Sequence, residues 1–286
     1  MALSRQDMRP DEVAIVDASE GDCTSAAAAA AAVTLEATGV RVLLVRLPGI
    51  SIAAGRNAAI RSLAGDIIAV TDAGCSPEPE WFREITAPLL ESRGDFVAGW
   101  FRPVAMSGLQ RAIAVMTTSG RPPRGFLPSS RSVAFRRSLW ERVGGYPEWL
   151  PWGEDSEYNR QCLRSGAVLV AAPAAMVAWP VRGSFGALAR QFWRYAYGDG
   201  MARHVSASLL WAPAAIASSA AAATFGAWSV AMGLLALPIG LRVALRSRRL
   251  PWTLWPSACA VAVVTMASRA FGYMAGLMSR PRRPVD

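Results

Sequence analysis

Two aspartates that each follow a short apolar run are the first candidates for chemistry in this sequence. Asp17 follows Val13–Val16, and Asp72 comes two residues after Ile67–Val70. Short apolar runs predict buried strands, and the carboxyl ends of parallel strands meet at one edge of a sheet, where such folds bind ligands. A carboxylate there can bind a nucleoside through hydrogen bonds, or coordinate Mg²⁺ or Mn²⁺ that bridges phosphates. The alternative is that each aspartate caps a turn.

An acidic pair, Glu154 and Asp155, opens a stretch of helical character that ends at Arg164, just before Gly166. A carboxylate in this position can act as a general base toward a hydroxyl group. Acidic residues are also common in the first turn of a helix, because the helix dipole stabilises them there. The pattern alone therefore supports either a catalytic pair or a plain helix start.

Several other kinds of site find no support in the sequence. It contains neither a G-x-x-x-x-G-K phosphate loop nor a complete G-x-G-x-x-G, because Gly198-Asp199-Gly200 lacks the third glycine. These absences argue against nucleoside triphosphate hydrolysis and dinucleotide redox chemistry. The four cysteines are far apart and form no C-x-x-C pair, so neither a disulfide framework nor a zinc site is expected.

The elements that must position these residues alternate between short extended runs and helical runs. This alternation predicts an α/β domain with a largely parallel sheet. We expect strands at 13–16, 42–45, 67–70, 96–100 and 132–135, and helices at about 25–39, 57–63 and 154–164.

The charge of the chain is concentrated at its C-terminal end. The formal net charge is +9, and residues 201–286 hold nine arginines and a single acid, Asp286, beside the most apolar part of the sequence. A nucleic-acid-binding domain would carry such charge on its folded part, whereas basic residues that flank apolar spans are typical of membrane proteins. We therefore expect a membrane partner and no nucleic acid. The 52% hydrophobic content also excludes a disordered chain.

Two apolar stretches, 209–241 and 251–278, each exceed the roughly 20 residues that a helix needs to cross a bilayer. They predict two or three transmembrane helices within 205–286, after a folded domain over 1–204. The first dozen residues lack the apolar stretch of a secretory signal, so we expect that domain to lie in the cytoplasm, on a multi-pass protein of the cell membrane. Arg269 should face another helix, a polar cavity or the interface.

Several blocks of the sequence, in their order along the chain, resemble family 2 glycosyltransferases. The resemblance covers roughly residues 12–204 and implies a GT-A fold, which is Rossmann-like, followed by C-terminal transmembrane helices. The last block is similar to the Q-x-x-R-W element of processive members, with tyrosine in place of tryptophan. The blocks are Gly55–Trp81, Ser130–Arg137, Val143–Pro147, Gly153–Asp155 and Gln191–Tyr195.

The resemblance implies inverting transfer of a sugar from a nucleotide-sugar to an acceptor hydroxyl. On the donor side, Asp17 would hold the nucleoside, and Arg56 would assist at the phosphates. Asp72 would coordinate Mg²⁺ or Mn²⁺ on the diphosphate, so that the negative charge developing on the leaving group is neutralised. The family's metal motif is usually D-x-D, whereas this chain reads Asp72-Ala73-Gly74, so metal binding would depend on one carboxylate.

On the acceptor side, the resemblance implies that Asp155 takes the proton of the attacking hydroxyl and that Glu154 positions it. Gln191 and Arg194 would lie near the acceptor or the diphosphate. The residues alone also allow another interpretation of Gln191–Tyr195, as an amphipathic helix on a membrane surface with aromatic side chains at the interface.

Two functional hypotheses follow from these observations. The first is a membrane-anchored glycosyltransferase that acts on a lipid-linked or other envelope-glycan acceptor. The second is a catalytically degenerate family member that serves as a non-enzymatic subunit of an envelope glycan assembly complex. The second hypothesis draws on the incomplete metal motif, and on the strand and helix that family members place before Val13–Asp17 and that are not found here. The alternative explanation for the missing strand and helix is that the true start of the protein lies upstream.

Overall fold

The computed structural model describes residues 2–120, 122, 126–204, 224, 240–241 and 243–279. The chain forms two compact units. The first unit comprises Met1–Arg102 and Gly120–Trp179, and the second comprises Pro103–Ser119 and Pro180–Asp286.

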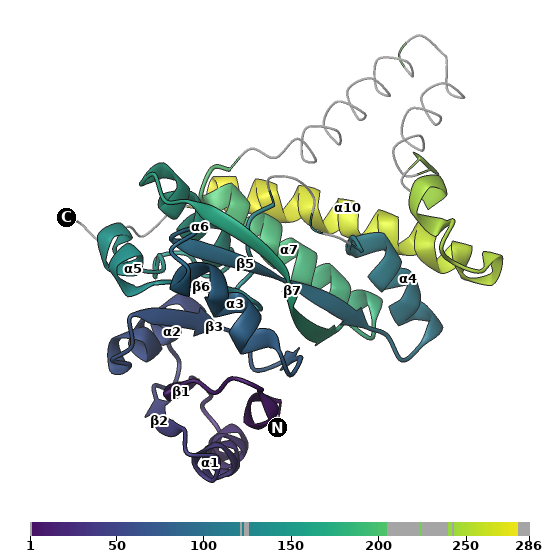
Figure 1. The fold of residues 1–286 in the computed structure, drawn as a ribbon. Helices are drawn as coiled ribbons and strands as arrows, with labels where there is room; N and C mark the ends of the chain where they lie inside the picture. The colour runs from purple at the N-terminus through teal and green to yellow at the C-terminus, as the bar shows by residue number, and fades with distance from the viewer. Residues whose placement is uncertain are drawn as a thin grey trace. The chain divides into compact units, whose positions relative to one another are not determined.

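The first unit alternates strands and helices, as the sequence predicts (Figure 1). The strands β5 and β7 begin in this unit and end in the second. Its elements are η1 (Leu3–Arg5), β1 (Glu12–Asp17), α1 (Asp22–Glu36), β2 (Arg41–Arg46), α2 (Ile52–Ser62), β3 (Ile67–Val70), β4 (Ser76–Pro77), α3 (Trp81–Leu90), β5 (Phe96–Val104), β6 (Val133–Arg136), α5 (Arg137–Val143), α6 (Glu154–Arg164) and β7 (Leu169–Pro180).

The sheets differ from the largely parallel sheet that we expected, and that prediction is wrong. β1 and β2 form a parallel two-stranded sheet, whereas the other strands form a five-stranded sheet in the order β3-β6-β5-β7-β4. β6 is antiparallel to both β3 and β5, and β4 is antiparallel to β7. The β3-α3-β5 crossover does keep one strand direction, as the α/β alternation predicts. The chain then returns after the helix α4 (Gly108–Thr117), and β6 lies between those two strands in the opposite direction, so the sheet is mixed.

Two hydrophobic cores cover the two faces of this sheet. Neighbouring residues of one strand point to opposite faces, and accordingly Phe96 and Phe135 belong to one core while Val97 and Ala134 belong to the other. The first core includes side chains from α2, α5 and α6, and the second includes side chains from α3. Two of the three helices on the first face carry candidate site residues: Arg56 lies on α2, and Glu154 and Asp155 lie on α6.

The second unit is helical in its described part. Its helices are α4 (Gly108–Thr117), α7 (Phe185–Met201), η2 (Trp252–Leu254) and α10 (Trp255–Met278). Among the described residues, one continuous helical segment, Trp252–Met278, is long and apolar enough to cross a membrane. The other predicted span, 209–241, lies outside the described residues except for Thr224, Gly240 and Leu241.

Asn57 on α2 fixes the segment that follows α5. Its Nδ2 donates hydrogen bonds to the Tyr146 carbonyl oxygen at 2.9 Å and to Glu148 Oε1 at 2.8 Å. Its Oδ1 accepts from the Tyr146 backbone N–H at 2.9 Å and from Trp140 Nε1 at 3.1 Å. Gly145 has a φ of 80°, and a Cβ there would lie 2.8 Å from Asn57 Oδ1, so glycine is required at this position. The buried amide therefore sets the position of Tyr146.

We expect Asn57→Ala to lower the free energy of unfolding by about 3 kcal/mol, because the change leaves several buried donors and acceptors without partners. Denaturant unfolding followed by circular dichroism measures this loss. Ser62→Ala, an exposed change on the same helix, is the control and should alter the free energy by less than about 0.5 kcal/mol. Equal effects of the two substitutions would contradict the role given to Asn57.

Candidate active site

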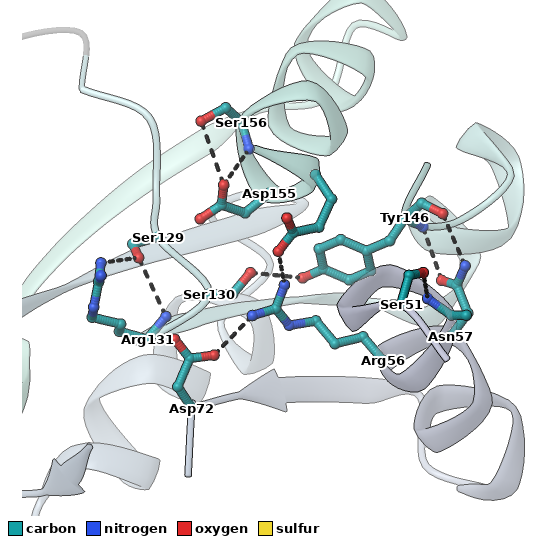
Figure 2. A network of polar contacts seen from close by, with 12 residues as sticks. Ser51, Arg56, Asn57, Asp72, Ser129, Ser130, Arg131, Tyr146, Asp155 and Ser156 are labelled. Carbon is teal, nitrogen blue, oxygen red and sulfur yellow. Dashed lines mark hydrogen bonds and ion pairs between the residues drawn. The ribbon is translucent and has the colours of Figure 1, made fainter. Parts of the chain in front are cut away.

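The guanidinium group of Arg56 joins two carboxylates that are distant in the sequence. Its Nη2 donates to Asp72 Oδ1 at 2.8 Å, and its Nη1 donates to Glu154 Oε1 (Figure 2). The Arg56 side chain is 15% exposed and that of Glu154 is 8% exposed, whereas that of Asp72 is 39% exposed. The pair with Glu154 is thus buried, and Asp72 is the member of the cluster that solvent or a ligand reaches most easily.

An aromatic pair supports Arg56. The guanidinium carbon lies 5.5 Å from the centroid of the Tyr146 ring, and Tyr146 stacks on Tyr158 with centroids 4.3 Å apart. The Tyr146 hydroxyl is 3.5 Å from Ser130 Oγ. Burial raises the pKa of Tyr146 well above its ordinary value, so its hydroxyl stays a neutral phenol. The ring therefore contributes a cation–π contact without adding negative charge.

The charged groups of the cluster shift one another's pKa values. Burial disfavours the charged form of Arg56, but the nearby carboxylates of Asp72, Glu154 and Asp155 outweigh this effect and raise the pKa of the guanidinium. Burial also raises the pKa of Glu154, and Asp155 adds to that shift while Arg56 opposes it. Arg56 is consequently a permanent cation, and Glu154 depends on it to remain ionised.

Asp155 lies next to this ion-paired group, at the start of α6. Its Oδ1 accepts hydrogen bonds from the Ser156 backbone N–H at 2.7 Å and from Ser156 Oγ at 3.4 Å. Gly153 precedes the pair with a φ of 78°, a conformation that favours glycine and turns the chain into the helix. Glu154 and Asp155 both lie in the first turn of α6. The helix start and the side-chain cluster thus coincide, so the two interpretations of the acidic pair do not exclude each other.

A second arginine, Arg131, packs over two aromatic rings. The Arg131 guanidinium lies 4.3 Å from the centroid of the Trp179 ring and 5.3 Å from that of Phe101, and its Nη1 donates to Ser129 Oγ at 2.8 Å. Sequence reasoning assigned no role to Arg131 or Tyr146, although both lie in blocks that resemble the family. Their positions within those blocks were the only indication of a role that the sequence offered, because the residues they contact come from other segments of the chain.

Asp17 is held by local partners. Its Oδ1 accepts from the Ser19 backbone N–H at 3.0 Å and from Ser19 Oγ at 2.6 Å, and its Oδ2 accepts from Ser25 Oγ at 2.5 Å. These hydrogen bonds lower the pKa of Asp17. Asp17 and Asp72 follow strands of two different sheets, so the argument from a shared sheet edge does not place them together.

The remaining predicted residues, Gln191 and Arg194, belong to α7 in the second unit. Gln191 is buried, and its Oε1 accepts from Arg182 Nε at 3.0 Å while its Nε2 donates to the Tyr195 hydroxyl at 2.9 Å. Arg194 is exposed. Gln191 therefore has hydrogen-bonding partners within its own unit.

The donor set for a divalent cation is small. Within the part of the chain that the structure describes, no group of three or more His, Cys, Asp or Glu side chains could hold a metal ion. Asp72 is followed by Ala73 and Gly74, and its exposed carboxylate is already shared with Arg56. One carboxylate fits Mg²⁺ or Mn²⁺ where substrate phosphates and water supply the other oxygen ligands. Asp72 is thus suited to a cation that arrives with a diphosphate, and not to a preformed metal site.

A comparison with protein-family models gives a match for the first part of the chain. Residues 2–132 match the model of glycosyl transferase family 2. This part of the chain is a family 2 glycosyltransferase domain. The resemblance inferred from the sequence is therefore confirmed over these residues, which make up just under half of the 286-residue chain. A comparison with curated protein sequences gave no match.

Two solved structures align with most of this chain. The mannosyltransferase PcManGT from Pyrobaculum calidifontis, solved in complex with GDP-Man and Mn²⁺, aligns with a TM-score of 0.59 and 22% identity over 94% of this chain and 81% of that one. S. aureus TarS 1-349, in complex with UDP, aligns with a TM-score of 0.47 and 15% identity over 94% of this chain and 84% of that one. The likeness to PcManGT supports the GT-A fold of this glycosyltransferase.

We expect Arg56→Met to lower the free energy of unfolding by about 3 kcal/mol, because it leaves the buried Glu154 carboxylate without its cation. Thermal and denaturant unfolding measure the change. Arg61→Met on the same helix is the matched control, since Arg61 is 61% exposed and its bridge to Glu148 is 3.6 Å long; it should have little effect. The double variant Arg56→Met with Glu154→Gln should recover part of the loss, and strict additivity would contradict the coupling.

The stability conferred by Asp17 should depend on pH. Because its pKa is lowered in the folded protein, its contribution is present above the unfolded pKa of about 3.9 and is lost as the pH falls toward the folded pKa. Asp17→Asn should therefore be less stable than the unsubstituted protein at pH 7, and the gap should narrow by pH 3. Urea unfolding at both pH values tests this, with Glu20→Gln, an exposed change in the same loop, as the control. If the difference in the free energy of unfolding between Asp17→Asn and the unsubstituted protein did not change with pH, this role of the ionised Asp17 would be excluded.

Proposed function

We propose that the glycosyltransferase moves a sugar from a nucleotide-sugar to an acceptor hydroxyl with inversion at the anomeric carbon. The observation that carries this proposal is the chain of contacts from Asp72 through Arg56 to Glu154, with Asp155 adjacent in sequence and in space. These contacts join a carboxylate that we assign to the donor side and a permanent cation to Glu154, which precedes the proposed base in the sequence. A single displacement needs these three functions close to one another.

On the donor side, Asp17 would bind the nucleoside, and Asp72 would hold Mg²⁺ or Mn²⁺. When bound, such a cation acts as a Lewis acid that neutralises charge on the leaving nucleoside diphosphate. Arg56 supplies a second positive charge. Its two carboxylate partners fix the direction of the guanidinium group. The group therefore needs little reorientation when negative charge develops nearby.

On the acceptor side, Asp155 would act as the general base. Ser156 holds Oδ1, so we assign proton transfer to Oδ2. The acceptor oxygen attacks the anomeric carbon while its proton passes to Asp155. The bond from that carbon to the diphosphate oxygen breaks, and its electron pair leaves with the nucleoside diphosphate. Attack from the face opposite the leaving group inverts the configuration.

The acceptor that we propose is a lipid-linked or other envelope glycan, reached at a membrane. The arginine-rich, apolar region over 201–286 supports membrane association, and Gln191 and Arg194 remain proposed contacts of the acceptor or the diphosphate. The alternative, a non-enzymatic subunit, draws on Ala73-Gly74 in the metal motif and on the engagement of Arg56 by both carboxylates.

Release of nucleoside diphosphate from a panel of nucleotide-sugars, with membrane extract as the acceptor source, distinguishes the two functions. Asp155→Asn should lower turnover by roughly 10² to 10⁴ while leaving donor affinity unchanged, because a general base acts in the chemical step. Asp72→Asn should instead weaken donor binding in the presence of Mn²⁺, as measured by calorimetry. Glu141→Gln, an exposed change on α5, is the control and should change neither quantity.

Each outcome of that experiment has a defined meaning. Donor binding that is unaffected by Mn²⁺, EDTA or Asp72→Asn would contradict the assigned cation role. If no nucleotide-sugar binds the full chain, with or without Mn²⁺, the subunit function replaces the enzymatic one. Full turnover by Asp155→Asn would remove this residue as the base.

A further inference from the structure

α10 and α7 are in contact backbone to backbone. A Cβ atom at Gly272 would lie 2.4 Å from the Trp193 carbonyl oxygen, and one at Gly276 would lie 2.1 Å from that of Tyr197. Contacts this short leave room only for hydrogen, so α10 cannot move away from α7 without losing a closely fitted surface. The guanidinium of Arg269 on α10 also lies over the Phe192 ring of α7, 4.9 Å from its centroid. The two helices form one layer.

The same contacts show that the helices run in parallel. The partner on α10 advances from Gly272 to Gly276 as the residue on α7 advances from Trp193 to Tyr197. The 17 residues of α7 span about 25 Å, close to the thickness of the hydrocarbon core. If α10 crossed a bilayer, α7 would be carried into it lengthwise.

α7 is unsuited to that environment. Arg190 and Arg194 are exposed on it, one turn apart, and Asp199 follows near its end. Each charged residue placed at the centre of a membrane helix costs about 2.5 to 3.5 kcal/mol even on the mildest scale. The pair of helices therefore has one charged member, and the length and composition of α10 alone do not make it a membrane span.

α10 nevertheless presents a continuous apolar stripe on the side away from its partners. The stripe follows the three- and four-residue spacing of one helix face, and Phe271 is 73% exposed and Met278 82% exposed within it. The opposite face carries the buried small residues Ala258, Ala262, Gly272 and Gly276. The stripe consists of Trp255, Cys259, Val263, Ala267, Phe271, Met274 and Met278.

Charge and aromatic residues next to the stripe indicate what covers it. Arg248 and Arg249 are exposed in the turn just before η2, and Trp252 in η2 is 79% exposed. Arginines attract anionic lipid headgroups, and tryptophan favours the boundary between headgroups and acyl chains. A second protein copy would not need this excess of one charge, whereas an anionic bilayer surface matches it.

We propose that α10 lies in the plane of an anionic lipid surface, with its apolar stripe at the headgroup and acyl boundary and α7 on its aqueous side. α10 is long and apolar enough to span a membrane, but under this proposal it is an interfacial helix. Both of its ends then lie on the face of the membrane that holds the first unit. This inference goes beyond the proposed reaction and does not depend on catalysis.

Single-cysteine variants of the full chain in membrane vesicles test the orientation. Three proteins each retain one thiol, at Cys23 in the first unit, at Thr253→Cys before α10, or at Ser279→Cys after it, with the other cysteines replaced by serine or alanine. Right-side-out and inside-out vesicles are treated with a membrane-impermeant maleimide, and detergent-opened vesicles give the total. We expect all three thiols to react from the same face.

Labelling of positions 253 and 279 from opposite faces would overturn the proposal, and so would labelling of either position only after detergent. A second measurement uses fluorophores attached at Cys259, Ala267→Cys and Met274→Cys, quenched by lipids brominated at shallow or deep acyl positions. An in-plane helix predicts the same shallow depth at all three. A spanning helix predicts that position 267 is deepest, and a stripe covered by a second copy of the chain predicts quenching by neither lipid.

Discussion

The ion pairs of Arg56 are the constraint on which the rest of the candidate site depends. A buried carboxylate such as Glu154 is costly unless a cation compensates it, and the guanidinium group satisfies it together with Asp72 through separate nitrogens. A lysine could not replace it, because a single ammonium group lacks the planar fork that reaches both partners. The positions of α2, the end of β3 and the start of α6 are therefore linked through one side chain.

Much of the local structure was predictable, because it follows from local sequence. The strand at Ile67–Val70 and the helix at Glu154–Arg164 are confirmed at their expected bounds. α2 starts earlier than expected, at Ile52, because Ser51 caps it by accepting from the Ala54 N–H. The cap lies beyond the apolar run from which the helix was predicted. The direction of β6 was not predictable, since an apolar run is the same for parallel and antiparallel pairing.

The candidate site was predictable only in part. Asp72, Glu154 and Asp155 stand next to strand and helix ends, where residue type and position indicate chemistry. The Arg56–Glu154 pair joins segments far apart in the sequence, and no local pattern encodes it. The same holds for Tyr146, whose position under the guanidinium depends on the hydrogen bonds of Asn57 and on a glycine with positive φ. Family resemblance located these residues, but their contacts required the three-dimensional structure.

The close fit of α7 against α10 bears on the order in which the polypeptide is assembled. Trp193 leaves the ribosome long before Gly272, so the face of α7 that includes Phe192 and the backbone of Trp193 and Tyr197 is synthesised before the helix that covers it. A shortened protein that stops near residue 204 would keep that face uncovered permanently. Anyone seeking a soluble fragment for crystallisation should therefore retain the distal helix, or replace the apolar residues of α7 that it covers.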